Sequence, residues 1–210
     1  MAKKKLKAEA KLKLKAKKKF YDYLVLCLLI ICLISGFLIG VREYKAMVSD
    51  KEARNVMETF EALAKIDGPT IEYSEKDVKL GKYKVIGKIK IERVGIEYPI
   101  LDRTDANSLN LSITKLVGPG LNALGNVTLA GHNTRNGKMF SRLHTLQPGD
   151  IIELTGNGKT LKYEVDQIYS VKPSETSSTG QNDGSYRELT LITCAAGGKQ
   201  RLVVKAIELL

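Results

Sequence analysis

Cysteine and histidine are scarce in this chain, which has three cysteines and two histidines among 210 residues. Cys27 and Cys32 lie in an apolar run, so Cys194 is the one cysteine outside it. A lone thiol outside this run has no partner there for an intrachain disulfide. It is therefore reactive, bonded to another chain, or buried and inert. Two histidines, His132 and His144, and one such thiol provide no ligand cluster for a structural zinc ion. The sequence therefore predicts no metal site.

Charged residues are absent from positions 24–41, which are mainly leucine, isoleucine, valine and cysteine. At ~1.5 Å rise per residue, this run is about the minimum for a helix that crosses a ~30 Å hydrocarbon core. A cleaved signal peptide is the alternative, but its apolar region is usually only ~7–15 residues long, and no convincing small-x-small cleavage site precedes Arg42. Residues 24–41 are therefore predicted to be an uncleaved transmembrane anchor. Gly36 and Gly40 form a small-xxx-small pair, a weak signal for a homodimer through this helix.

Acidic residues are almost missing before the anchor, where positions 3–19 hold ten lysines and one glutamate. The first nineteen residues contribute +9 of the net charge of +11, so the remainder is nearly neutral. Excess lysine marks the cytoplasmic flank of a membrane helix, which places residues 1–23 inside the cell and Arg42 onward outside it. A basic patch confined to this flank indicates topology and contact with anionic lipid, and it argues against nucleic-acid binding.

Residues 42–82 are predicted to be a helical stalk and linker. Apolar side chains recur at three- and four-residue steps over positions 42–66, and Asp67-Gly68-Pro69 ends the helix. The polar remainder of this helix fits either a free stalk or an amphipathic flank lying on the globular part.

Residues 83–210 carry seven or eight short strand patterns at close intervals. Gly156-Asn157-Gly158 indicates a hairpin turn, a short helix is predicted over 107–116, and a helical turn is predicted over 139–146. Positions 173–186 are rich in serine, threonine, glycine and asparagine, which predicts a long loop. The pattern predicts a mainly β fold, a closed seven- to eight-stranded barrel with short helices.

Three chemically active side chains lie at ends of predicted strands. One apolar strand ends at Gly131-His132, a second ends at Cys194, and Arg201 begins the last strand. The connection between Cys194 and Arg201 is short enough for an antiparallel pair, so the thiol and the guanidinium should lie near each other. A neighbouring cation favours the thiolate, which makes Cys194 a candidate nucleophile.

These residue types fit acyl transfer at a peptide carbonyl. Cys194 is the predicted nucleophile, His132 the general acid and base, and Arg201 the group that stabilises the oxyanion or the substrate. Thr193 is predicted to contribute a hydroxyl or backbone donor near the substrate, with a purely structural strand residue as its alternative. His144 is predicted to be structural or exposed.

The motifs resemble those of the sortases, the cysteine transpeptidases of the Gram-positive cell surface. Thr190-Leu191-Ile192-Thr193-Cys194 is similar to the family's Thr-Leu-x-Thr-Cys signature, and residues 126–132 resemble its strand ending in Gly-His. Arg201 falls where the family carries its arginine, and residues 86–101 resemble its opening strands. The resemblance covers about positions 85–210, and the family's usual arginine or lysine after Gly-His is Asn133 here.

The resemblance implies cleavage of a sorting signal such as Leu-Pro-x-Thr-Gly between threonine and glycine, through a thioacyl enzyme. The implied partners are sorting-signal-bearing surface proteins and an amine acceptor, usually a peptidoglycan precursor or, in pilus-building members, a pilin lysine. An amino-terminal anchor resembles classes A and D. No cofactor is implied; some class A members bind calcium through barrel loops, but Glu175 and Asp183 are too scattered to indicate a site.

Other functions remain open from the sequence. A pilus-associated or hydrolytic cysteine peptidase would use the same residue types, and a non-catalytic surface scaffold would leave Cys194 inert. An L,D-transpeptidase is disfavoured because its Cys-x-Arg arrangement is absent. Specificity is predicted to lie in the loops at 173–186 and 107–122, because loops on a rigid barrel carry such variation.

Overall fold

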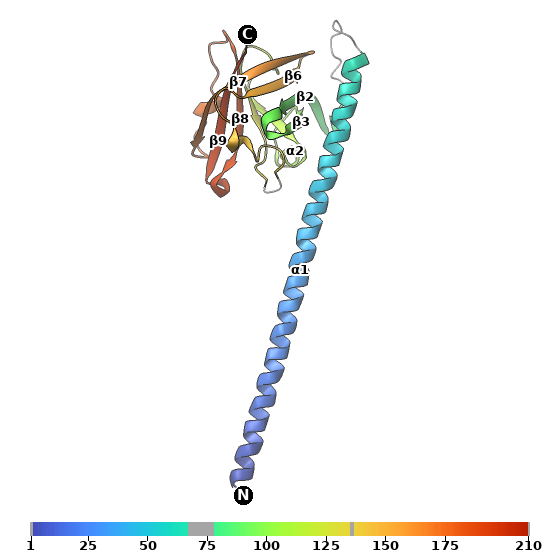
Figure 1. The fold of residues 1–210 in the computed structure, drawn as a ribbon, viewed down its shortest axis with the longest axis vertical. Helices are drawn as coiled ribbons and strands as arrows, with labels where there is room; N and C mark the ends of the chain where they lie inside the picture. The colour runs from blue at the N-terminus through green and yellow to red at the C-terminus, as the bar shows by residue number, and fades with distance from the viewer. Residues whose placement is uncertain (1, 67–77, 135–136, 210) are drawn as a thin grey trace. The chain divides into compact units, whose positions relative to one another are not determined.

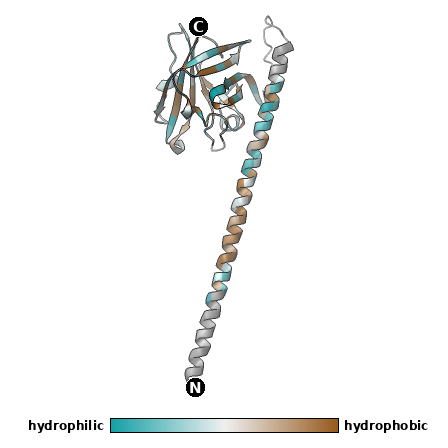
Figure 2. Cartoon of the chain, viewed as in Figure 1, coloured by the Kyte–Doolittle hydropathy of each residue, from teal (hydrophilic) through white to brown (hydrophobic). Residues whose placement is uncertain are grey.

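A computed structural model describes residues 2–66, 78–134 and 137–209, and it divides into two compact units, Met1–Val48 and Ser49–Leu210. The first helix, α1 (Ala2–Ile66), ends at the residue where the sequence predicted its end. Its stretch Lys19–Thr59 is long and apolar enough to cross a membrane, and Figure 2 shows the apolar band that contains the predicted anchor. Side chains in this band are exposed, with Leu33 at 74% and Phe37 at 70%.

The carboxyl-terminal part of α1 packs within the globular unit. Ala53 and Met57 are buried, and Ala53 belongs to a small apolar cluster that includes Leu80 and Tyr83. Asp50 accepts a hydrogen bond of 3.1 Å from the Tyr98 hydroxyl. These contacts favour the amphipathic flank over the free stalk for residues 50–57. The predicted ends of the tail, anchor and linker at residues 23, 41 and 82 stay predictions. Residues 67–77 of the linker lie outside the described residues.

One closed sheet forms the barrel (Figure 1). Its strands run in the order β1-β2-β3-β4-β5-β8-β9-β7-β6, and a β2–β6 pairing closes it. Strand β1 is a two-residue addition to β2, so eight strands make the barrel, which confirms the predicted fold class. The strands are β1 (Lys79–Leu80), β2 (Tyr83–Ile91), β3 (Ile96–Leu101), β4 (Ile113–Val117), β5 (Gly125–Ala130), β6 (Ile151–Gly156), β7 (Lys159–Val171), β8 (Arg187–Ala195) and β9 (Gln200–Glu208).

Alternating side chains send one face of β2 into the barrel. In β2, buried and half-buried residues alternate along its nine positions, and Ile89 and Ile91 are fully buried. The predicted hairpin joins β6 to β7, with positive φ values at Asn157 (52°) and Gly158 (70°). A two-residue turn of this kind matches the right-handed twist of the strands it connects.

The predicted helix at 107–116 is wrong in its second half. Helix α2 (Ala106–Leu111) begins at Asp105, whose carboxylate accepts bonds from the N–H groups of Asn107 and Ser108, and it ends before β4. Strand β4 pairs in parallel with β3 and antiparallel with β5, and these two partners decide the structure of residues 113–117. The remaining helical segments are the short turns η1 (Glu92–Val94), η2 (Leu143–Thr145), η3 (Ser177–Thr179) and η4 (Ala196–Gly198).

Candidate active site at the ends of β5, β8 and β9

Strands β5 and β8 lie side by side and run parallel, so their carboxyl ends meet at one edge of the sheet. Ala130 pairs with Ile192, and the next residue, Gly131, donates its N–H to the Ile192 carbonyl at 3.2 Å. His132 and Cys194 each lie two residues beyond these paired positions. The parallel pairing therefore brings the predicted acid–base residue and the predicted nucleophile to the same end of the barrel.

Two side-chain hydrogen bonds fasten the histidine segment to β8. The buried Thr193 hydroxyl donates to the Gly131 carbonyl at 2.7 Å, and the Asn133 amide donates to the Cys194 carbonyl at 2.8 Å. His132 lies between these attachments and is half-buried. Asn133, which the sequence analysis noted only as a departure from the family, is one of the residues that hold the site together.

Thr193 uses its hydroxyl within the fold. The side chain is 3% exposed and faces inward, whereas Cys194 follows on the opposite face and is half-buried. Thr193 therefore helps to position the histidine segment, because its hydroxyl bonds the Gly131 carbonyl. A direct contact between Thr193 and a substrate stays a prediction.

Cys194 and Arg201 are cross-strand partners in the antiparallel β8–β9 pair. Directly paired residues have Cβ atoms about 4.5–5.5 Å apart on the same face of a sheet, so both side chains serve the same surface. The Arg201 Nη1 donates to the carbonyls of Gly198 and Gln200, both at 3.2 Å. These two bonds hold the guanidinium against the η4 turn and leave Nε and Nη2 without a partner in the described part of the chain.

Gly131 is required at its position because a phenyl ring lies against it. A Cβ there would be 2.7 Å from Cδ2 of Phe140, a ring that is fully buried in the barrel core. The Phe140 N–H also donates to the His132 carbonyl at 3.0 Å. Because Gly131 has no side chain, the segment that carries Phe140 can pack directly against the histidine segment.

Gly131→Ala is expected to lower both stability and peptide cleavage, because the added methyl displaces either Phe140 or the histidine segment. Overpacking of this kind costs about 1–3 kcal/mol. Thermal unfolding and cleavage rates should be compared with those of Gly120→Ala, whose Cβ would meet only a side-chain atom at 3.4 Å. Wild-type stability and activity in Gly131→Ala would contradict this account of the site.

His144, Glu175 and Asp183 each contact a residue two or three positions away in the sequence. His144 is exposed in η2, and its Nδ1 lies 2.9 Å from the Ser141 carbonyl. Glu175 accepts a bond from Ser177, and Asp183 accepts bonds from Ser185. Across residues 2–66, 78–134 and 137–209, no group of three or more histidine, cysteine or acidic side chains could hold a metal ion.

The predicted specificity region at 107–122 ends in a structural asparagine. Asn122 is 2% exposed, and its amide donates to the carbonyls of Leu154, Gly156 and Lys159. Tyr163 donates its hydroxyl to Asn122 Oδ1 at 3.1 Å, and burial raises the pKa of Tyr163 to about 12, so the hydroxyl remains a donor. Asn122 therefore ties this connection to the β6–β7 hairpin.

Comparison with known proteins relates this architecture to one family. A family model described as a sortase domain matches residues 89–208, more than half of the chain. Sortase A of Bacillus anthracis is 27% identical over 181 residues, which cover 80% of this chain and 85% of that protein. Sortase A of Staphylococcus aureus is 24% identical and covers 79% of this chain and 82% of its own. The solved structure of a Clostridium perfringens sortase D5 transpeptidase has a TM-score of 0.63 at 28% identity, covering 76% of this chain and 99% of its own.

Proposed function

The chain belongs to the sortase family of cysteine transpeptidases, which act on sorting-signal-bearing surface proteins and cell-wall amine acceptors, and from this premise we propose its specific role. The protein is a membrane-anchored transpeptidase that cleaves a Leu-Pro-x-Thr-Gly-like sorting signal and transfers the resulting acyl group to a cell-wall amine. Its catalytic residues are Cys194, His132 and Arg201. The observation that carries the proposal is the cross-strand pairing of Cys194 with Arg201, beside a histidine segment bonded to the same strand end.

In the first half of the reaction, the Cys194 thiolate attacks the carbonyl carbon of the scissile peptide bond. A C–S bond forms, and the carbonyl oxygen becomes an oxyanion. Nε and Nη2 of Arg201 are the donors that would stabilise this charge, since Nη1 is bonded to the η4 turn. The C–N bond then breaks, and His132 gives its proton to the departing amine. The product is a thioacyl enzyme.

In the second half, the amine of the acceptor attacks the thioester carbonyl. His132, now neutral, takes a proton from the attacking nitrogen. The C–S bond breaks, the thiolate leaves, and a new amide joins the surface protein to the acceptor. The same three side chains therefore serve both half-reactions, in opposite directions of proton transfer.

Two features of the amino-terminal segment support the proposed location of the enzyme. The exposed apolar band within Lys19–Thr59 supports a single membrane-spanning segment, and the lysine-rich residues before it favour a cytoplasmic amino terminus. The catalytic unit then lies outside the cell, where surface proteins and peptidoglycan precursors meet. Gly36 and Gly40 have open space around them, which is compatible with weak pairing of two such helices.

The test uses a soluble segment that begins at Ser49, because residues 50–57 pack on the barrel. Sorting-signal peptides are incubated with and without an amine acceptor, and the enzyme and products are weighed by mass spectrometry. An acyl adduct on Cys194 that transfers to the amine supports the proposal. Cleavage with no transfer to any amine would identify a hydrolase, and an inert thiol with no adduct would favour a scaffold.

Arg201→Gln is expected to lower kcat/KM by about 10²–10³-fold, the usual cost of losing an oxyanion donor. Arg201→Lys should recover only part of this loss, because an ammonium lacks the planar fork of donors. Lys199→Gln removes an exposed cation from the same connection and serves as the control for charge alone. If Lys199→Gln lost as much activity as Arg201→Gln, the effect would belong to local charge.

A further inference from the structure

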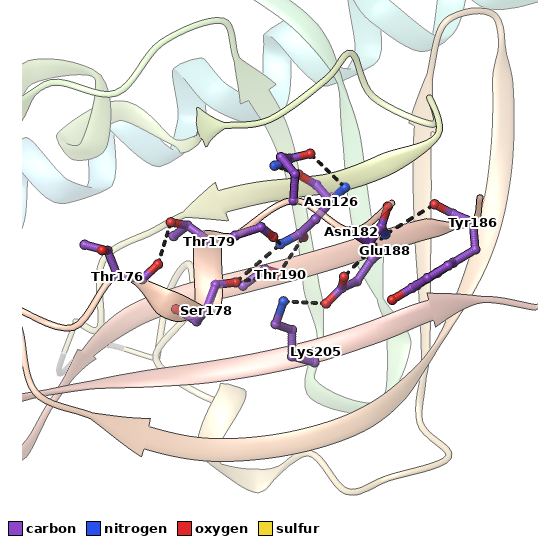
Figure 3. Close-up of polar contacts among 11 residues, drawn as sticks. Asn126, Thr176, Ser178, Thr179, Asn182, Tyr186, Glu188, Thr190 and Lys205 are labelled. Carbon is purple, nitrogen blue, oxygen red and sulfur yellow. Dashed lines mark hydrogen bonds and ion pairs between the residues drawn. The ribbon is translucent and has the colours of Figure 1, made fainter. Parts of the chain in front are cut away.

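A buried asparagine connects the barrel to the β7–β8 loop, residues 172–186. Asn126 is fully buried at the start of β5 (Figure 3). Its side-chain amide donates to the carbonyls of Gly180 at 2.9 Å and Ser178 at 3.3 Å. Its backbone N–H and C=O pair with the side chain of Gln181, at 3.2 and 2.8 Å. Asn126 therefore makes four hydrogen bonds to three loop residues, Ser178, Gly180 and Gln181.

Thr190 completes this arrangement from β8. Its hydroxyl donates to Asn126 Oδ1 at 2.7 Å and also lies 3.5 Å from the Ser178 carbonyl. Both the acceptor and the two donor positions of the Asn126 amide are thereby used. The orientation of the amide is fixed by the Ser178 and Gly180 carbonyls, because turning it over would bring its oxygen against these two acceptors.

The same face of β8 carries the nucleophile. Leu189 and Leu191 belong to the barrel core, so Thr190 and Cys194 lie on the opposite, outer face. Four residues of strand separate them, which is about 13 Å at ~3.3 Å per residue. The turn η3 contacts Thr190 through the Ser178 carbonyl, so it lies about four residues along β8 from Cys194.

A second attachment holds the far end of the loop. Glu188 forms an ion pair with Lys205, and both side chains are largely buried, at 13% and 15% exposure. The Asn182 amide lies 3.5 Å from Glu188 Oε2 and 3.4 Å from the Tyr186 carbonyl (Figure 3). The loop is thus fastened within η3 and on its carboxyl-terminal side, by neutral amide bonds at residues 178–181 and by a charged group at Asn182.

We propose that Asn126 and Thr190 are positioning residues for substrate recognition. They hold η3 as the far wall of the peptide groove, at a fixed distance of about four residues from Cys194, and they do so without a bound metal ion. The inference rests on the proposed function, since it concerns the groove of that reaction. The Asn126 amide donates to the main-chain carbonyls of the loop, and the Thr190 hydroxyl donates to the amide oxygen.

Thr190→Val is the informative variant, because it removes one hydroxyl and preserves the shape of the side chain. It leaves Asn126 Oδ1 buried without its donor, so the loop should open more often. We expect KM for a sorting-signal peptide to rise about fivefold, as loss of one hydrogen bond typically allows, with kcat and the rate of Cys194 alkylation unchanged. Hydrogen exchange over residues 176–181 should become faster, and Thr190→Ser should restore the wild-type values.

Thr128→Val is the matched control. Thr128 pairs directly with Thr190, is equally buried, and its hydroxyl has no hydrogen-bond partner among the described residues. This variant should leave KM and loop exchange unchanged. Equal effects of the two substitutions, or unchanged KM and exchange in Thr190→Val, would overturn the inference, as would a wild-type KM that rises on treatment with EDTA.

The exchange measurement separates the two proposals. If the wild-type enzyme transfers no acyl group from any peptide, the proposed function fails, but loop exchange in Thr190→Val still reports whether Asn126 and Thr190 order the loop. If acyl transfer is intact and loop exchange is unaffected by Thr190→Val, the positioning role alone is wrong.

Discussion

Cys194→Ala is expected to abolish acyl-enzyme formation and to lower turnover by at least about 10⁴-fold, the scale seen when a catalytic nucleophile is removed. The reason is chemical, because the methyl group of alanine cannot form the thioester. The fold should be unaffected, since Cys194 is half-buried at a strand end and its hydrogen bond from Asn133 uses the backbone carbonyl. Mass spectrometry of the enzyme after exposure to peptide measures the adduct, and thermal unfolding checks the fold.

The control uses the two remaining cysteines. Cys27 and Cys32 lie on the exposed, apolar part of α1, so full-length protein with both replaced by alanine should retain wild-type transfer in detergent. Alkylation that depends on Cys194 in this background would identify the reactive thiol without ambiguity. A Cys194→Ala protein that still formed a covalent acyl adduct would remove the basis for the mechanism.

The relation between Cys194 and Arg201 could be predicted because it is local in sequence. A short connection between two strand patterns forces an antiparallel pair, and the observed register places the two residues directly opposite each other. The barrel was also predictable, because alternating burial and turn residues recur along positions 83–210. In both cases, neighbouring stretches of chain carry the information.

Long-range parallel pairing was not predictable in the same way. Strands β5 and β8 are separated by the β6–β7 hairpin and the long loop, and no turn residue specifies that they meet. Asn126 therefore appeared to be an ordinary strand residue, although its contacts with residues 178–181 become evident once β8 lies beside it. The error at 113–117 has a related cause, since β4 becomes a strand by pairing with both β3 and β5, and its own residues do not specify these partners.

Asn133 shows how a departure from a family pattern acquires a physical meaning. The family's arginine or lysine at this position would bring a charge next to the nucleophile, whereas Asn133 supplies a neutral amide bonded to the Cys194 carbonyl. The bond fixes the distance between the histidine segment and β8. In this chain Arg201 is therefore the cation whose position is set by direct strand pairing with the nucleophile.

His132→Ala is expected to lower kcat/KM by about 10²–10⁴-fold, the usual contribution of a general acid and base. Without an imidazole, the departing amine must leave unprotonated in the first half-reaction, and no group takes the proton from the acceptor amine in the second. The loss should therefore appear in both acylation and transfer, which single-turnover experiments can measure separately. Alanine retains the backbone at this position, including the carbonyl that accepts from Phe140.

His144→Ala provides the matched control, because it removes the chain's other imidazole from an exposed position in η2. Its Nδ1 contact is with the Ser141 carbonyl, a local contact three residues away, so activity should stay within about twofold of wild type, as for most exposed substitutions. Equal losses in the two variants would show that neither histidine has a specific role. A large loss in His132→Ala alone, in both half-reactions, would show that His132 donates a proton during cleavage and accepts one during ligation.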